Sequence, residues 1–197
     1  ESRAEVFAAR AICLGCAVAL DMARATGLDE WAARAAFLTP IAKAHGTDVG
    51  IRIADTAVQV HGGMGYIEET GAAQYLRDVR ITAIYEGTNG IQAMDLVGRK
   101  LSDGGAAAMA LLDEILDGAK AAQGTEPDLA NQLWQAAETL REATHDLLER
   151  DLPERFAGAV PYLSAFARVL GAHYHLRAAT GGGSKALARL YIARILP

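Results

Sequence analysis

Apolar side chains recur every three or four residues along most of this chain, and that spacing places them on one face of an α-helix. The stretch closest to an extended segment, residues 58–67, is interrupted by Gly62, Gly63 and Gly65, which disfavour a strand. We therefore predict an all-α protein. The predicted helices cover residues 2–26, 29–38, 39–61, 71–84, 88–101, 105–123, 127–150, 161–180 and a last segment that ends near residue 196.

Residues that favour helix ends support these boundaries. Ser2 and Glu5 have the spacing of an N-terminal capping box. Asp29 can cap the second helix. Thr39 followed by Pro40 is typical of an N-cap and a first helical residue, so we expect a new helix to begin there.

The chain also shows a division into two parts. Gly104 and Gly105 follow the fifth predicted helix, and the sequence beyond them becomes richer in alanine. We predict two helical bundles, residues 1–103 and residues 104–197, with a turn at residues 151–153 and a flexible linker at residues 181–183. The first helix is apolar nearly all round, which predicts burial in a bundle or at a subunit interface.

The composition excludes several classes of protein. Hydrophobic residues make up 51% and charged residues 22%, as in globular proteins. The formal net charge is −5, and neither half is basic, so we expect no nucleic-acid partner and no anionic membrane. No run of about 18 uninterrupted apolar residues predicts a membrane span.

The cysteines and the paired histidines do not predict a metal site. Cys13 and Cys16 lack a second pair, so we expect both to be small apolar fillers on the first helix. The lack of a disulfide framework is typical of a reducing compartment, and we expect a cytoplasmic protein. His173 and His175 are two residues apart, which turns them to different sides of a helix, so packing or surface roles are expected.

Two polar segments leave alternatives open. Arg77, Asp78 and Arg80 form either an ordinary polar helix face or an ion-pair network that sets the following loop. The break at residues 85–88 holds Glu86, either as a solvated carboxylate in a linker or as a catalytic group on a rigid scaffold.

Three segments in one continuous run resemble the C-terminal signature of the acyl-CoA dehydrogenases. They are residues 59–66 (QVHGGMGY), residues 75–78 (YLRD) and residues 84–92 (IYEGTNGIQ). The resemblance covers residues 1 to about 101. Residues 106–197 are similar to an additional helical domain in one branch of that family, which includes enzymes acting on 3-methylmercaptopropionyl-CoA.

The resemblance implies a flavoenzyme with an N-terminal helical domain, a middle β-domain and a C-terminal four-helix domain. Only the last domain and its extension are expected here, so the chain is expected to be a fragment that is inactive alone. FAD would lie between the middle and C-terminal domains and reach a neighbouring subunit. The implied FAD contacts are Gln59, Val60, His61, Gly62 and Gly63, toward the partner's FAD, and Thr88, Asn89 and Gly90 at a helix N-terminus.

The resemblance also implies the catalytic chemistry. Glu86 matches the base that removes the α-proton of an acyl thioester, while the β-hydrogen leaves as hydride to the flavin. The backbone N–H of the base residue would help to hold the thioester oxygen, as in an oxyanion hole. Tyr85 and Gly87 are then expected to lie beside the acyl substrate.

The implied function is oxidation of an acyl-CoA to the 2-enoyl-CoA by a homodimer or homotetramer. An electron-transfer flavoprotein or a similar acceptor would receive the electrons. Two rivals remain. One is a family member that associates with DNA, which would need a basic face. The other is a non-catalytic module for oligomerisation, which would assemble without flavin.

Overall fold

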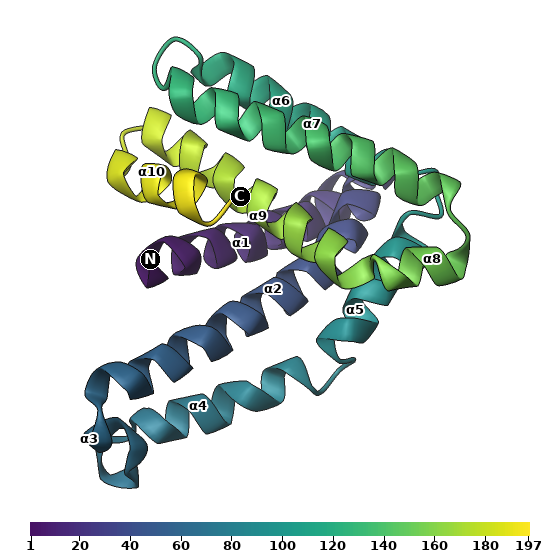
Figure 1. The fold of residues 1–197 in the computed structure, drawn as a ribbon. Helices are drawn as coiled ribbons and strands as arrows, with labels where there is room; N and C mark the ends of the chain where they lie inside the picture. Colours follow the sequence, from purple (N-terminus) through teal and green to yellow (C-terminus); the bar gives the residue numbers. More distant parts are fainter.

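The computed structural model describes all residues 1–197 and is entirely helical, as predicted (Figure 1). In chain order the elements are α1 (Ser2–Thr26), α2 (Asp29–His61), α3 (Gly63–Tyr66), η1 (Glu68–Thr70), α4 (Ala72–Arg80), η2 (Ile81–Ala83), α5 (Asn89–Asp95), η3 (Leu96–Lys100, a π-helical segment), α6 (Ala106–Ala122), α7 (Pro127–Glu149), α8 (Leu152–Ala157), α9 (Ala159–Thr180) and α10 (Lys185–Arg194).

The helices form antiparallel pairs around a central helix. α1 packs against α2, and α4 returns along the far half of α2 after the small α3–η1 cap (Figure 1). α6 and α7 form a hairpin on the other side of the molecule. Between these layers runs α9, which contacts α1, α2, α5, α6, α7 and α10.

One hydrophobic core joins the two predicted bundles. Its 37 buried residues extend from Ala4 to Ile192 without separating at the glycine pair. Phe37 of α2 and Phe166 of α9 meet edge to face, with ring centroids 5.0 Å apart. The predicted joint is present as a turn after η3, but the second bundle packs on the first through α9. Periodicity shows which helix faces are apolar and does not show which other helix covers them.

The predicted break at Thr39-Pro40 is wrong, because α2 continues through it from Asp29 to His61. A proline inside a helix removes one backbone hydrogen bond and crowds the preceding turn. Here Phe37, Leu38 and Ile41 are fully buried around the proline, and their packing holds the helix together. The Thr39 hydroxyl turns back and donates to the carbonyl of Ala35 at 2.7 Å rather than capping a new helix.

Three other local predictions are also corrected. Ser2 and Asp29 are already helical, and the N-cap positions before them are Glu1 and Leu28, without side-chain hydrogen bonds. The expected turn at residues 151–153 is the start of α8, where the Asp151 carboxylate accepts from the backbone N–H of Glu154 at 3.0 Å. Residues 63–66, which lie between two predicted helices, form the short helix α3.

Within this chain the first helix is buried on only one side, which agrees with burial in a bundle for its inner side and leaves the predicted alternative, a subunit interface, open for its outer side. Leu14 and Val18 are 62% and 55% exposed. By length and composition alone α1 would suffice to cross a bilayer. The criterion of about 18 uninterrupted apolar residues, used above for membrane spans, did not select it. Arg10 and Asp21 interrupt its apolar run, and its inner side packs on α2 and α9 as a core helix does. In this chain the apolar helix with the most complete burial is α9.

Gly171 lies where the core leaves no room for a side chain, and replacing it by Ala should lower the free energy of unfolding by about 2 kcal/mol. A Cβ at this position would lie 2.3 Å from the Tyr191 hydroxyl and 2.9 Å from the Cβ of Ala8. Chemical denaturation of the 197-residue chain measures the loss. Gly124→Ala is the control, because nothing lies within 4 Å of its Cβ position. Equal stabilities of the two variants would contradict this packing.

Candidate functional site

The break between η2 and α5 is a strained turn centred on Glu86. Glu86 has φ 55°, and it is the one non-glycine residue of the chain with positive φ. Gly87 follows with φ 86°. A left-handed conformation costs a residue with a side chain about 1–2 kcal/mol, so the surrounding contacts must hold it. Strain of this kind is concentrated at functional sites, which makes Glu86 a candidate.

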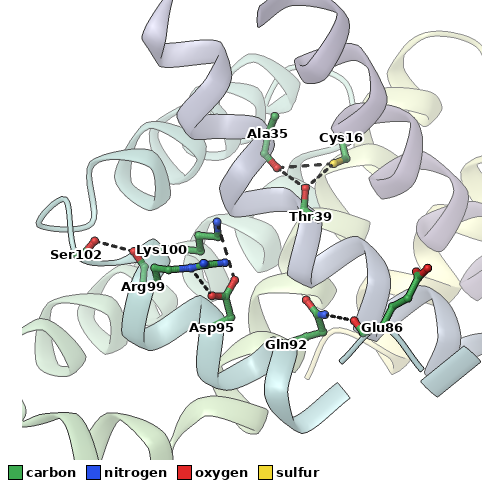
Figure 2. A network of polar contacts seen from close by, with 9 residues as sticks. All are labelled: Cys16, Ala35, Thr39, Glu86, Gln92, Asp95, Arg99, Lys100 and Ser102. Carbon is green, nitrogen blue, oxygen red and sulfur yellow. Dashed lines mark hydrogen bonds and ion pairs between the residues drawn. The ribbon is translucent and has the colours of Figure 1, made fainter. Parts of the chain in front are cut away.

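Contacts from α5 fix one side of the turn. Thr88 is the N-cap of α5, as predicted, and its hydroxyl accepts from the backbone N–H of Ile91 at 3.3 Å. The Gln92 side chain reaches back and donates to the carbonyl of Glu86 at 3.1 Å. Figure 2 shows this contact, with the Glu86 carboxylate extending away from Gln92. The carboxylate has no ion-pair partner and is exposed in this chain.

Contacts from α2 fix the other side. The Lys43 ammonium donates to the carbonyl of Gly87 at 2.7 Å and to the Asn89 side-chain oxygen at 2.9 Å. The Asn89 amide in turn donates to the Thr47 hydroxyl at 2.9 Å and the Asp48 carboxylate at 2.7 Å. The side chain of Asn89 is therefore engaged within the chain, which leaves its backbone for any ligand.

The backbone N–H groups of the turn have no partners within the chain. The N–H groups of residues 86–90 have no acceptor anywhere in this chain. Backbone N–H groups are strong donors that need water or a ligand when they are not paired internally. A run of them beside a carboxylate can hold an oxygen atom or a phosphate within reach of a base.

A groove of about 440 Å³ borders the turn. Its walls come from α2, the turn, α5 and η3. The Arg99 guanidinium lies 2.7 Å from the Asp95 carboxylate, and the Lys100 ammonium approaches the same carboxylate at 3.9 Å (Figure 2). Beside Glu86 the groove is lined by Thr39, Pro40 and Gly87, among others. Tyr85 is half exposed and not part of this lining.

The second glycine-rich segment lies at the opposite end of α4 from Glu86 (Figure 1). Gln59, Val60 and His61 form the exposed last turn of α2, and Gly62 and Gly63 lead into α3. A Cβ at either glycine would meet nothing within 4 Å, so the space beside this backbone is open. The structure does not bring the two predicted FAD segments into one site. The expectation that they serve FAD molecules of different subunits stays a prediction.

The charged residues of α4 form no network at the turn. Arg77 pairs with Glu68 of η1 at 3.5 Å, and both side chains are more than half exposed. Asp78 and Arg80 have no ion-pair partner within 4.0 Å. Within this chain the contacts therefore support the first alternative, an ordinary polar face of α4.

The cysteines and histidines form no metal site. No group of three or more potential metal ligands exists. Cys16 is buried as predicted, with its sulfur 3.6 Å from the Thr39 hydroxyl, whereas Cys13 is exposed and the prediction of a buried filler is wrong for it. His173 and His175 are both buried, which confirms a packing role.

Each buried histidine has a defined environment. The Nε2–H of His175 donates to the carbonyl of Ala4 at 3.0 Å, and burial lowers its pKa. The Nε2 of His173 lies 3.6 Å from the Glu114 carboxylate, which also binds Arg34 at 2.6 Å. His173 and Arg34 lower the pKa of Glu114 to about 2. These contacts join α6, α9 and α2 and lie outside the Glu86 turn.

The sequence did not reveal the residues that hold the turn. Lys43 and Thr47 are one helical turn apart on α2, so a common face could have been inferred. Nothing in the pattern indicated that this face would meet α5. Gln92 was within the quoted motif but had no assigned role, because its contact with Glu86 requires the left-handed turn.

Residues 1–101 match the family described as "Acyl-CoA dehydrogenase, C-terminal domain", and residues 108–197 match "Acetyl-CoA dehydrogenase C-terminal like". The 3-methylmercaptopropionyl-CoA dehydrogenase of Ruegeria pomeroyi is 42% identical over 140 residues, which are 66% of this chain and 23% of that protein. The short-chain acyl-CoA dehydrogenase of Megasphaera elsdenii is 52% identical over 54 residues, 27% of this chain and 14% of that protein.

The fold has a solved counterpart. The crystal structure of Caenorhabditis elegans ACDH-11 in complex with C11-CoA superposes with a TM-score of 0.83 at 18% identity, over 96% of this chain and 33% of that one. At this identity the likeness establishes the fold. This chain spans about a quarter of the length of the Ruegeria pomeroyi enzyme. The two matched families together account for nearly all residues, and the chain belongs to the acyl-CoA dehydrogenase family.

Proposed function

We propose that this chain forms the C-terminal part of an FAD-dependent enzyme that converts an acyl-CoA thioester to the 2-enoyl-CoA, with Glu86 as the base. The observation that carries the proposal is the strained turn. It presents an unpaired carboxylate next to backbone N–H groups that have no acceptor in the chain. A base and preorganised donors side by side are what removal of a proton α to a carbonyl requires.

In the proposed reaction the residues of the turn have separate roles. The Glu86 carboxylate takes the α-proton. The free N–H of Glu86 holds the thioester oxygen, where negative charge develops as that proton leaves. Gly87 has no side chain, so an acyl chain can pass close to the backbone. Bound FAD would supply the acceptor for the β-hydrogen, which leaves as hydride, and this would balance the loss of the α-proton.

The residues present fit the two faces of an FAD site. The unpaired N–H groups of Thr88, Asn89 and Gly90 suit a polar or anionic part of the cofactor. At the other end of α4, the open space beside Gly62 and Gly63 lets a cofactor approach the backbone closely. Gln59, Val60 and His61 are exposed on the same turn of helix and would border it.

An apolar surface supports assembly into a homodimer or homotetramer. A groove of about 640 Å³ between α1, α2 and α4 is lined mainly by apolar residues. On α1, Leu14 and Val18 are also exposed. Contiguous apolar surface of this kind marks protein–protein contacts, either with further domains or with a second subunit.

The rival functions have less support. A nucleic-acid partner would require a basic face, and the chain is acidic. A module that serves only in assembly would not need a strained carboxylate turn with free donors. We extend the proposal to an electron-transfer flavoprotein or similar acceptor, which restores the oxidised flavin after each turnover.

A flavin spectrum of the full-length enzyme tests the proposal. We expect stoichiometric FAD and bleaching of its absorbance on anaerobic mixing with acyl-CoA thioesters, in a panel that includes short straight chains and 3-methylmercaptopropionyl-CoA. The 197-residue chain alone should bind no FAD, because it provides only parts of the site. A full-length protein that assembles without flavin would support the assembly module instead.

A further inference from the structure

Lys43 makes an uncommon set of contacts for a lysine. Its ammonium is half-buried between α2 and α5 and donates to two neutral oxygens, the carbonyl of Gly87 and the side-chain carbonyl of Asn89. No carboxylate lies within 4.0 Å of it, unlike Lys100, which approaches Asp95. A lysine held at neutral acceptors is placed by geometry and not by a counter-ion.

These acceptors belong to the turn that carries the proposed base. Gly87 and Glu86 are consecutive residues with positive φ, so the turn has two left-handed positions in a row. Gln92 holds the carbonyl of Glu86, and Lys43 holds the carbonyl of Gly87. Both peptide groups that follow the two residues are therefore anchored, one from α5 and one from α2.

Anchoring the carbonyls also orients the donors. In a trans peptide the C=O and the N–H point in opposite directions. Because the Gly87 carbonyl faces Lys43, the Thr88 N–H of the same peptide faces away from α2. In the preceding peptide, the Glu86 carbonyl faces Gln92, so the Gly87 N–H of that peptide faces away from Gln92. The free donors beside the base are thus aimed by the contacts that hold the carbonyls.

From this geometry we infer that Lys43 is a positioning residue for Glu86. This inference rests on the proposed function of the Glu86 turn. Lys43 does not reach the substrate in this role. It keeps the Glu86 carboxylate and the neighbouring N–H groups in one arrangement, and a displacement of about 1 Å at a reacting centre can cost a hundredfold in rate. A charge-assisted hydrogen bond is about twice as strong as a neutral one, which explains why a lysine serves here.

Substitution of Lys43 in the full-length enzyme tests the inference. Lys43→Met should lower the rate constant of flavin bleaching at saturating acyl-CoA by about tenfold, with FAD content and bleaching amplitude unchanged. Lys43→Arg, which keeps the donors and the charge, should recover part of the loss. Lys120→Met is the matched control, because Lys120 is exposed on α6 and makes no ion pair. If the Met variant does not fold, Lys43→Gln takes its place with the same expected direction.

The outcomes separate positioning from a merely structural role. A structural role would lower the amplitude or the FAD content while the remaining enzyme bleaches at the wild-type rate, and that result would overturn the inference. A Met variant within twofold of wild type in rate constant would also overturn it. A wild-type enzyme that does not bleach with any acyl-CoA refutes the proposed function itself, together with this inference. If the wild type and the Met variant both bleach at the normal rate, the positioning role of Lys43 is refuted and the proposed function stands.

Discussion

Glu86→Gln in the full-length enzyme should lower the rate constant of flavin reduction by about 100-fold or more, the usual scale for the loss of a general base. Glutamine has nearly the shape of glutamate but lacks the basic oxygen. The contact from Gln92 uses the backbone carbonyl of residue 86, so it survives the substitution. The fold of the turn and the binding of FAD and acyl-CoA should therefore stay within about twofold of wild type, by the same reasoning on ground-state contacts.

Rapid mixing with a matched acyl-CoA measures this rate directly, as the decay of oxidised-flavin absorbance. Glu142→Gln is the control, because Glu142 is an exposed glutamate of α7 with no ion pair. Bleaching of the Glu86→Gln variant near the wild-type rate would move the base to another residue. The turn would then be a structural linker, and its strain would have no catalytic explanation.

Local signals predicted the helices well because they act within one or two turns. The all-α class follows from spacing, and the cap at Thr88 follows from its residue type. The predicted helix break at Pro40 is absent from the structure, because burial of Phe37, Leu38 and Ile41 against other helices offsets the local cost of the proline. Tertiary packing of this kind overrides propensity and cannot be read from adjacent residues.

The continuous core is another feature that local signals do not predict. The glycine pair at residues 104 and 105 does end one helical group, yet α9 packs across to α1 and α2 and gives one continuous core. Which apolar faces meet depends on the path of the chain in space. For the same reason the pattern of α1 does not show which of its sides meets the core, since an apolar helix can face either the core or a partner.

For the candidate site, Glu86 came from the family motif and not from local physics. The left-handed turn of Glu86, the anchoring by Lys43 and the unpaired donors of residues 86–90 are visible only in three dimensions. They add a physical reason for the motif. The glycine and the glutamine of that motif allow and hold a turn that few residues adopt.

A second prediction with a large effect concerns His45, whose burial should make the fold sensitive to mild acid. His45 lies on α2 beside a cavity of about 420 Å³ between α1, α2, α9 and α10, and its Nε2 has no hydrogen-bond partner. Burial and the positive charge of Arg52 lower its pKa from 6.5 to about 4, and Asp48 and Glu5 only partly offset them. Arg168 of α9 acts in the same direction as Arg52.

The sign follows from the protons bound in each state. Below pH 6.5 the unfolded chain protonates His45 while the folded chain does not until about pH 4. The free energy of unfolding should therefore fall as the pH is lowered from about 6.5 to about 4, by on the order of 3 kcal/mol from this group. Glu114, with a pKa of about 2, adds its own loss only below its ordinary value of 4.5. His175, whose pKa is also lowered by burial, acts in the same direction as His45, so the comparison with a His45 variant isolates the contribution of His45.

Denaturant unfolding of the 197-residue chain at pH 7, 5.5 and 4.5, followed by helical circular dichroism, measures this dependence. His45→Gln removes the titrating group. The fall in the free energy of unfolding between pH 7 and pH 4.5 should therefore be smaller in this variant, by most of the roughly 3 kcal/mol assigned to His45. His145→Gln, at an exposed position of α7, should retain the wild-type slope. The comparison uses slopes and not absolute stabilities, because Gln can change the packing at pH 7. Parallel slopes for wild type and His45→Gln would show that His45 is protonated in the fold, and that the cavity beside it supplies a partner or water that burial alone does not predict.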